Sequence, residues 1–251
     1  MPNPVELFMQ SFSLAIKKPA LILGIIYFGA AMLIGLGVAA IVILVGALGI
    51  AFLAAINNMW VSIIVIFLAG IIGLIILLLV QAILNIFSYK GFSQIEISGN
   101  YNFDEISHAI RQRLIPTIVV TIVTTLLVFL LMAIILIPAY LLFQEIGLLI
   151  GIFIAIVILF FVSPLFINAT PIVVLEKTGG IRAVQKSIAF GVKNYIFNLA
   201  AIFVMLAATA ILTVLSIIPI VGIVISYLFT IVAVFYLLKI YAENTKRSPR
   251  L

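Results

Sequence analysis

The sequence has no cysteine, one histidine and few charged residues. Its 251 residues include seven acidic and 13 basic side chains, and the charged fraction is 8%. Without cysteine the chain cannot form a disulfide, a thiolate metal ligand or a cysteine nucleophile. A zinc site takes three or four side-chain ligands, and the single histidine, His108, has no second histidine beside it. We therefore expect no catalytic activity, no metal and no cofactor.

Hydrophobic residues make up 67% of the chain, whereas soluble domains average roughly 45–50%. One soluble core cannot bury this much apolar surface, but lipid can surround it. The sequence therefore predicts an all-α polytopic membrane helix bundle, organised as a single integral membrane domain over residues 1–251. The net charge of +6 comes from cations in short loops between spans, so anionic membrane lipids are the expected partner, and nucleic acid is not.

Long apolar runs predict about six transmembrane helices, because a helix needs about 20 residues to cross the hydrocarbon core. The predicted spans cover residues 20–56, 61–87, 115–142, 147–167, 195–217 and 221–241. The first run exceeds one perpendicular crossing and predicts one long, tilted helix. A break at Gly35/Gly37 or Gly46/Gly49 is the alternative, and so is a seventh span hidden in residues 20–87. Residues 57–60 are a predicted turn, with Trp60 as an interfacial anchor.

Six spans place every lysine and arginine on one side of the membrane and only Glu145 on the other. Cytoplasmic loops carry an excess of such cations. We therefore expect a multi-pass protein of the cell membrane with both termini in the cytoplasm. Lys17 and Lys18 directly precede the first span, which we expect to be an uncleaved anchor.

Three similar units follow one another, each with a short amphipathic helix, a basic cluster and an apolar hairpin. The helices are expected over residues 3–18, over 102–113 and from Gly180 onwards. Asn3 and Glu6 have capping-box spacing in the first helix. The same pattern, Ser-x-Ala-apolar, recurs in all three helices, at Ser13, Ser107 and Ser187. The sequence thus predicts three pseudo-repeats whose amphipathic helices lie at the membrane surface, as anchors or as lipid- or partner-binding elements.

The third unit carries a family resemblance in three short segments. Residues 171–176 (PIVVLE) lead into residues 180–187 (GIRAVQKS) and residues 193–195 (KNY). This pattern resembles six-span prokaryotic membrane proteins of unknown function related to the membrane domain of glycerophosphodiester phosphodiesterases. The resemblance covers most of the chain in layout. It implies six spans and a membrane location but no activity, because the chemistry of that group lies in a separate soluble domain.

Neutral polar residues in the spans are candidates for a functional site, since no acidic residue lies mid-span as an ion-coupled pump would need. The candidate residues of a cytoplasm-facing polar cavity are Gln81, Asn85, Ser88, Asn168 and Asn198. Such a cavity would take a headgroup or a small solute. The alternative is that these side chains only form interhelical hydrogen bonds, each contributing about 0.6–2 kcal/mol.

Basic residues at the span ends are the candidate contacts to lipid headgroups. They are Lys17, Lys18, Arg111, Arg113, Arg182, Lys186 and Lys193. His108, on the polar side of the second amphipathic helix, is expected to be a solvated interfacial side chain. Two rows of small residues, Gly147/Gly151/Ala155 and Ala31/Gly35/Ala39, allow helices to approach closely, either within the chain or in a dimer.

The leading hypothesis is a non-catalytic integral membrane scaffold, assembly factor or lipid-binding component. Such a component would bind a membrane-protein partner or a second copy of the chain. The alternative is a small-solute or ion transporter or channel with a polar cavity open to the cytoplasm. A lipid-modifying enzyme is the third hypothesis, and it lacks a visible set of acid, base or metal groups.

Overall fold

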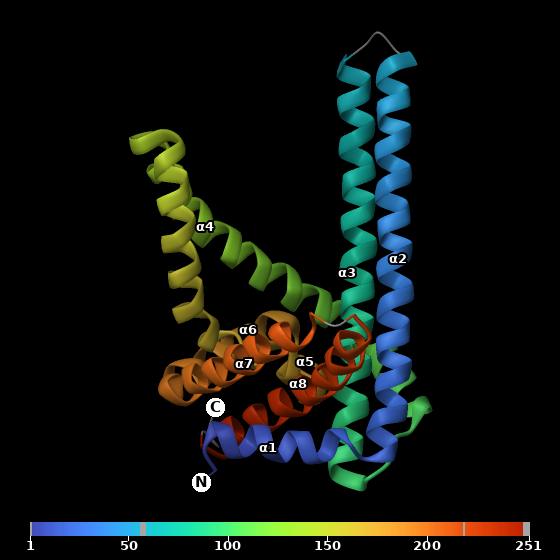
Figure 1. The fold of residues 1–251 in the computed structure, drawn as a ribbon, viewed down its shortest axis with the longest axis vertical. Helices are drawn as coiled ribbons and strands as arrows, with labels where there is room; N and C mark the ends of the chain where they lie inside the picture. The colour runs from blue at the N-terminus through green and yellow to red at the C-terminus, as the bar shows by residue number, and fades with distance from the viewer. Residues whose placement is uncertain (1, 56–58, 218, 248–251) are drawn as a thin grey trace.

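The computed structural model describes residues 2–55, 59–217 and 219–247, which form helices joined by short connections (Figure 1). No strand occurs in the described part of the chain, so the predicted all-α membrane bundle is confirmed. The elements in chain order are α1 (Pro4–Ala15), α2 (Lys18–Ala55), α3 (Met59–Ser98), α4 (Phe103–Val162), the 3-10 turn η1 (Ser163–Leu165), α5 (Ala169–Leu175), α6 (Gly180–Lys193), α7 (Tyr195–Leu215) and α8 (Pro219–Arg247).

Five helical stretches among the described residues are long and apolar enough to cross a membrane: Lys18–Gly37, Gly70–Ser98, Phe103–Leu175, Tyr195–Leu215 and Gly222–Arg247. The protein is thus a multi-pass membrane protein. The third stretch has 73 residues, far more than the roughly 20 needed for one crossing. Gln144 breaks it, with backbone angles of φ 51° and ψ −130° inside α4. The chain reverses there (Figure 1), and the two halves of α4 contain the third predicted span and residues 147–162 of the fourth.

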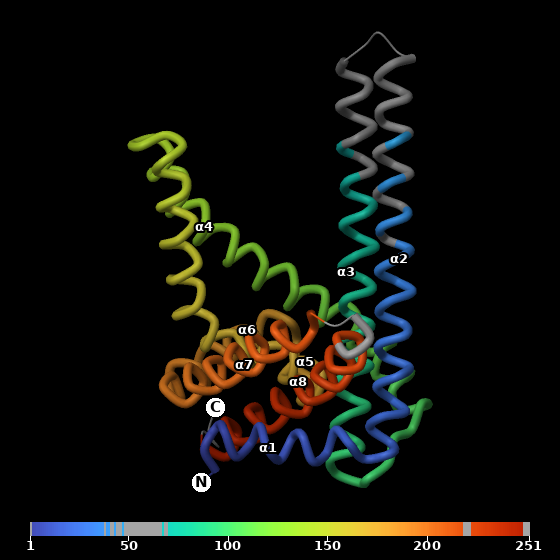
Figure 2. Tube along the Cα trace, in the orientation of Figure 1, coloured from blue at the N-terminus to red at the C-terminus, as the bar shows by residue number. Residues whose placement is uncertain are grey.

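The first hydrophobic run forms one helix, α2, of 38 residues. It lies beside α3, which has 40 residues, in a tall hairpin (Figures 1 and 2). Neither glycine pair interrupts α2, so the predicted single long helix is confirmed, and the described residues of this region form no third helix between α2 and α3. The predicted turn at Asn57 and Asn58 and the side chain of Trp60 lie outside the described residues.

The first and third amphipathic helices form as predicted. The Glu6 N–H donates to Asn3 Oδ1 at 2.8 Å, and the Asn3 N–H donates to Glu6 Oε2 at 3.2 Å, which completes the capping box of α1. Helix α6 starts at Gly180 and buries Val184 and Phe190.

The second amphipathic helix requires a correction. Asn102 does cap a helix, accepting from the Asp104 N–H at 2.9 Å. That helix then continues through Pro116 into the span as the single element α4. Proline removes one backbone donor and strains the turn before it, but here it does not end the helix. The second unit therefore has no separate surface helix.

We call the lower part of the molecule in Figure 1 the base: residues 4–18, residues 86–98 of α3, residues 103–120 of α4, residues 169–193 with α5 and α6, and residues 231–247 of α8. Its core contains fully buried side chains from α3, α4, α5 and α8, including Phe92, Ile106, Ile172 and Phe235. Both the start of α1 and the end of α8 lie at the base (Figure 1). The charged residues of the ion pairs also belong to it, with Lys239 of α8 bonded to Glu96 of α3 at 3.1 Å.

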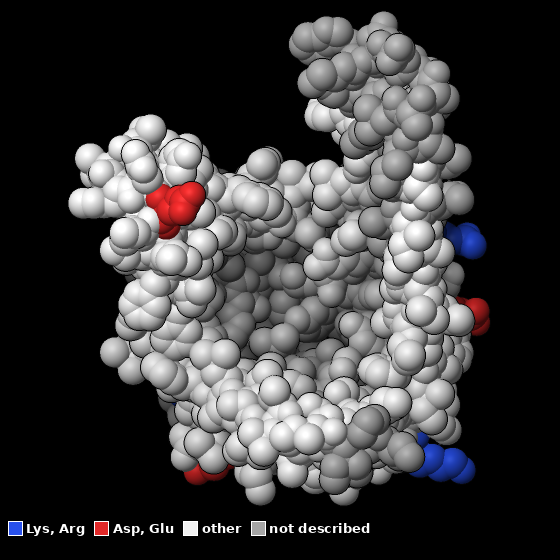
Figure 3. All heavy atoms as spheres, turned by 45° about the horizontal axis from the view of Figure 1, so that its top comes forward, with Lys and Arg blue, Asp and Glu red and all other residues white. Residues whose placement is uncertain are grey.

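Above the base, the α2–α3 hairpin and the α4 hairpin diverge. Figure 3 shows a wide hollow between them, and the described surface inside it carries no charged side chain in this view. Exposed apolar side chains such as Leu126, Phe129 and Leu141 cover α4. Surfaces of this kind face lipid or another apolar partner rather than water. Polar chemistry is therefore concentrated at the base.

Candidate anion-binding pocket and buried amide cluster

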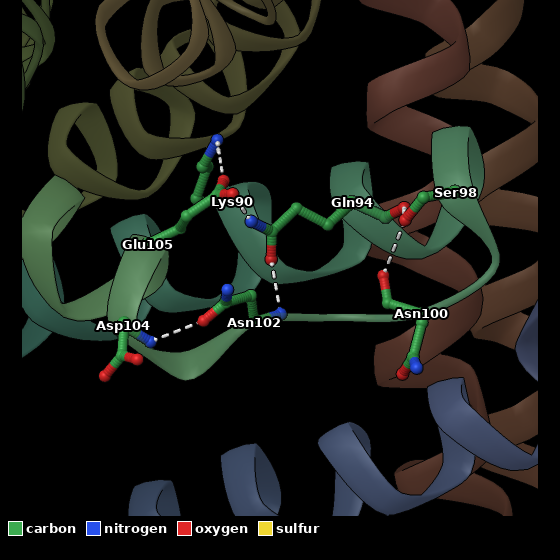
Figure 4. A network of polar contacts seen from close by, with 7 residues as sticks. All are labelled: Lys90, Gln94, Ser98, Asn100, Asn102, Asp104 and Glu105. Atoms are coloured by element: carbon green, nitrogen blue, oxygen red, sulfur yellow. Dashed lines mark hydrogen bonds and ion pairs between the residues drawn. The ribbon is translucent and has the colours of Figure 1, made fainter.

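The connection between α3 and α4 is held by a chain of polar contacts (Figure 4). Helix α3 ends at Ser98, whose Oγ donates to the carbonyl oxygen of Asn100 at 3.0 Å. Gly99 has a φ of 76°, in the left-handed region that glycine adopts without strain. The Asn102 N–H donates back to Gln94 Oε1 at 3.1 Å. The start of α4 is therefore fixed against the last turns of α3.

Glu105, on the first turn of α4, completes this network (Figure 4). Its carboxylate accepts from Gln94 Nε2 at 2.6 Å and lies 3.3 Å from Lys90 Nζ. The hydrogen bond from Gln94, followed by the bond and charge of Lys90, lowers the pKa of Glu105. The Lys90 and Glu105 side chains are 31% and 58% exposed, and exposed pairs of this kind contribute only about 0–1 kcal/mol. Glu105 is thus ionised but weakly held.

Next to Glu105 lies a pocket of about 200 Å³ between α3, α4 and the end of α5. Its lining residues are Lys90, Glu105, His108, Ala109, Gln112, Arg113, Val174, Leu175 and Lys177. The lining contains three cations and one carboxylate, which leaves two positive charges before His108 is counted. Arg113 and Lys177 take part in no ion pair within the described part of the chain. The pocket therefore has the charge and the donors to hold an anion.

His108 and Gln112 lie one helical turn apart on the wall of this pocket. Gln112 Nε2 is 2.8 Å from His108 Nε2. The predicted solvated position of His108 agrees with its exposure. No group of three or more histidine, cysteine, aspartate or glutamate side chains that could hold a metal ion occurs in the described part of the chain.

Lys177 is placed by an unusual backbone. Its φ of 59° puts a lysine in the left-handed region, which costs a non-glycine residue about 1–3 kcal/mol. The following loop is packed tightly, because a Cβ on Gly180 would lie 2.6 Å from the Pro116 carbonyl oxygen. This close approach to α4 fixes the loop and keeps Lys177 on the pocket wall.

The predicted headgroup contacts divide into three groups. Exposed side chains on the base are Lys17, Lys18, Arg111, Arg182 and Lys193. Arg113 is half-buried in the pocket. Lys186 instead bonds Glu176 at 2.6 Å, and this carboxylate also accepts from Tyr241 at 2.9 Å. Lys186 therefore braces α6 against the end of α5 and α8, and its charge is already paired.

Two pocket cations, Lys90 and Lys177, were missing from the predicted contacts. Lys90 lies inside α3 and not at its end, because α3 continues to Ser98. The second span was predicted to end at residue 87, so Lys90 was not expected to lie within a helix. The sequence signal that could have identified Lys177 is its position just before the glycine pair Gly179 and Gly180.

Asn168 and Asn198, two members of the predicted polar cavity, meet in a buried cluster with Asn244 of α8. The Asn244 Nδ2 group donates to Asn198 Oδ1 at 2.7 Å and to Asn168 Oδ1 at 3.3 Å. Asn198 Nδ2 donates to the Pro164 carbonyl oxygen at 3.2 Å. All three side chains are fully buried. The cluster thus joins α7, α8 and the start of α5.

The orientation of these amides follows from the carbonyl of Pro164, which can only accept. It fixes Asn198 as the donor there, so Asn198 Oδ1 must accept from Asn244. Asn168 Nδ2 and Asn244 Oδ1 then have no protein partner within the described residues. A buried polar atom without a partner costs roughly 1–3 kcal/mol. The loss of one more hydrogen bond from the cluster would therefore be costly.

The other predicted cavity residues lie apart from this cluster, on α3. Gln81 is exposed, Asn85 is half-buried, and Ser88 Oγ donates to the Asn85 carbonyl oxygen at 3.0 Å. Within the described part of the chain, no hydrogen bond links them to Asn168 or Asn198.

Comparison with family models, with curated proteins and with solved structures found no match for this chain. The resemblance to membrane domains of the glycerophosphodiester phosphodiesterase group therefore stays a prediction.

Proposed function

We propose that the protein is a non-catalytic integral membrane component that binds anionic lipid headgroups in the pocket between α3, α4 and the α5–α6 loop. The observation that carries this proposal is the pocket's lining of Lys90, Arg113 and Lys177 against one carboxylate, Glu105. Each basic residue near an anionic membrane surface contributes about 1 kcal/mol of attraction. In this proposal the positively charged base of the molecule faces the cytoplasm of the cell, and both termini lie there.

The pocket lies at the level where polar surface gives way to apolar surface. Two residues after Arg113, Ile115 is 73% exposed on the opposite side of α4, and the apolar part of the helix continues from there. The pocket lining itself contains the apolar residues Ala109, Val174 and Leu175. The pocket thus lies beside the apolar level of α4, where a lipid headgroup is the favoured ligand.

A scaffold role rests on a second observation. Gly147, Gly151 and Ala155 are buried against the preceding half of α4, since a Cβ on Gly151 would lie 3.0 Å from Ala139 Cβ. By contrast, a Cβ on Gly35 would meet nothing within 4 Å. The small-residue face of α2 thus stays open in the single chain, where a partner helix or a second copy fits.

Removing two pocket cations is expected to weaken binding of anionic lipid about thirtyfold, as two contributions of about 1 kcal/mol imply. The variant is Arg113→Gln with Lys177→Asn, since asparagine tolerates the left-handed backbone at position 177. The measurement is retention of phosphatidylglycerol against phosphatidylcholine by purified protein, read by native mass spectrometry.

The matched control is Lys17→Gln with Lys193→Gln, which removes the same charge from exposed positions outside the pocket. We expect the control to lose clearly less anionic lipid than the pocket variant, because its two cations attract the membrane surface without lining the pocket. Equal losses in both double variants would show that only total charge matters, and the proposal of a binding pocket would then be abandoned.

A small-solute transporter is the second candidate function, favoured by the amides buried among apolar helices. It requires water to reach Asn198, which is fully buried. The chain has no cysteine, so single cysteines report access without background. We expect Asn198→Cys to resist a membrane-impermeant thiol reagent, while Lys177→Cys at the exposed pocket wall reacts rapidly. Fast labelling at position 198 in folded protein would favour transport over the scaffold.

A further inference from the structure

Resting on the proposed function, we infer that the pocket takes a phosphate monoester dianion and that Glu105 competes with this ligand for Lys90. The contact between Glu105 and Lys90 at 3.3 Å is then the one that the ligand replaces. The charge and size of the pocket indicate the chemical class of the ligand. The hydrogen bonds around Glu105 indicate that it competes with the ligand for Lys90.

The charge of the pocket matches a dianion. Lys90, Arg113 and Lys177 carry three positive charges and Glu105 one negative charge, so two positive charges are uncompensated. A phosphate monoester carries about −1.5 to −2 at pH 7, whereas a phosphodiester carries a single negative charge. The monoester therefore neutralises the site, and the diester leaves it positive.

The size and donors of the pocket agree with a phosphate group. Its volume of about 200 Å³ is below the roughly 300–1,000 Å³ of sites for drug-sized ligands. The Arg113 guanidinium offers a planar pair of donors, and the two lysine ammonium groups offer point charges. Arginine and lysine in this combination bind phosphate oxygens through charge-assisted hydrogen bonds.

Glu105 presents to Lys90 and Gln94 the oxygen acceptors that a phosphate would present. The Gln94 Nε2 and Lys90 Nζ groups both point to its carboxylate (Figure 4). Because the carboxylate is exposed, this pairing is weak, and a dianion can take over Lys90. Gln94 also accepts from the Asn102 N–H through its Oε1 atom, so the same side chain bonds both Glu105 and the α3–α4 turn.

Two sources offer the same chemistry: a lipid headgroup such as that of phosphatidic acid, and free phosphate. The experiment uses the full chain in nanodiscs of phosphatidylcholine, with phosphatidic acid or phosphatidylglycerol added, or with inorganic phosphate titrated from solution. We expect phosphatidic acid to bind about fivefold more tightly than phosphatidylglycerol, as one further charge contact of about 1 kcal/mol implies. Inorganic phosphate that binds without anionic lipid, and is lost in Lys177→Asn, would support the monoester chemistry with a soluble source.

The competition is tested with Glu105→Gln, which keeps an acceptor for Gln94 but removes the charge facing Lys90. We expect it to tighten binding of phosphatidic acid about threefold, within the range that an exposed ion pair permits. Asp104→Asn is the matched control, because Asp104 is exposed on the same turn and lies outside the lining of the pocket. We expect no tightening there.

The outcomes separate the inference from the function on which it rests. Equal affinities for phosphatidic acid and phosphatidylglycerol would overturn the monoester assignment, while anionic-lipid binding itself would stand. Equal effects of Glu105→Gln and Asp104→Asn would overturn the competition. No preference of any form of the protein for anionic over neutral lipid would overturn the proposed function as well.

Discussion

Replacing Gly191 with alanine is expected to lower the apparent melting temperature by about 5–10 °C. An alanine Cβ at this position would lie 2.5 Å from Leu165 Cα and 2.8 Å from the Pro164 carbonyl oxygen. Both are backbone atoms, so no side-chain rotation relieves the overlap. Overpacking of this kind costs about 1–3 kcal/mol, and in a chain of this length each kcal/mol shifts the midpoint by about 2–4 °C.

The close approach at Gly191 is supported by a contact one turn earlier on α6. Ser187 Oγ donates to the Leu165 carbonyl oxygen at 2.8 Å, so two small residues on one face of α6 contact the backbone of η1. Circular dichroism of the protein in detergent, followed during heating, measures the effect. An unchanged midpoint would mean that α6 does not pack on η1 as the structure has it.

Gly29→Ala is the matched control for the same chemical change. A Cβ on Gly29, inside α2, would meet nothing within 4 Å. Alanine also favours a helix interior over glycine by roughly 0.5–1 kcal/mol. We therefore expect this variant to melt at the same temperature or slightly higher, which separates the steric effect of Gly191 from a general effect of alanine.

The helices could be predicted from the sequence because each apolar run exceeds what a bilayer crossing needs, and caps mark the starts. Asn3 and Glu6 have the spacing of a capping box, and the box forms. The path of the chain after each helix start could not be predicted in the same way. Residues 103–116 form the beginning of α4 rather than a separate helix. The strain that Pro116 introduces is smaller than the stabilisation of the continuous helix, so the helix does not end there.

The candidate site was predictable only in part, because sequence spacing shows which residues share an element but not which elements meet. Asn168 and Asn198 are 30 positions apart and come together through Asn244. That asparagine belongs to the end of a helix that was expected to stop near residue 241, so nothing marked it as buried. The pocket likewise combines Lys90, Arg113 and Lys177 from three separate segments.

Replacing Asn244 with alanine is expected to destabilise the protein by about 3 kcal/mol. The change removes the Nδ2 donor shared by Asn198 Oδ1 and Asn168 Oδ1, at 2.7 Å and 3.3 Å. Both acceptors stay buried, and each buried polar atom left unpaired costs about 1–3 kcal/mol. Heating in detergent with circular dichroism measures the loss, and Thr245→Ala, an exposed neighbour on the same helix, is expected to melt as the unaltered protein does.

A second variant at the same position separates the hydrogen bond from the space that alanine leaves empty. Asn244→Asp keeps the size of the side chain but replaces the amide donor by an oxygen, which faces the Oδ1 atoms of Asn168 and Asn198. If the donor holds α8 to α7 and α5, the aspartate should destabilise the protein at least as much as the alanine, because it also buries a charge or forces protonation. An aspartate variant as stable as the unaltered protein would show that size alone is required there. In that case the three amides would be packing residues, and the end of α8 would be held by Lys239 and Tyr241 instead, through their bonds to Glu96 and Glu176.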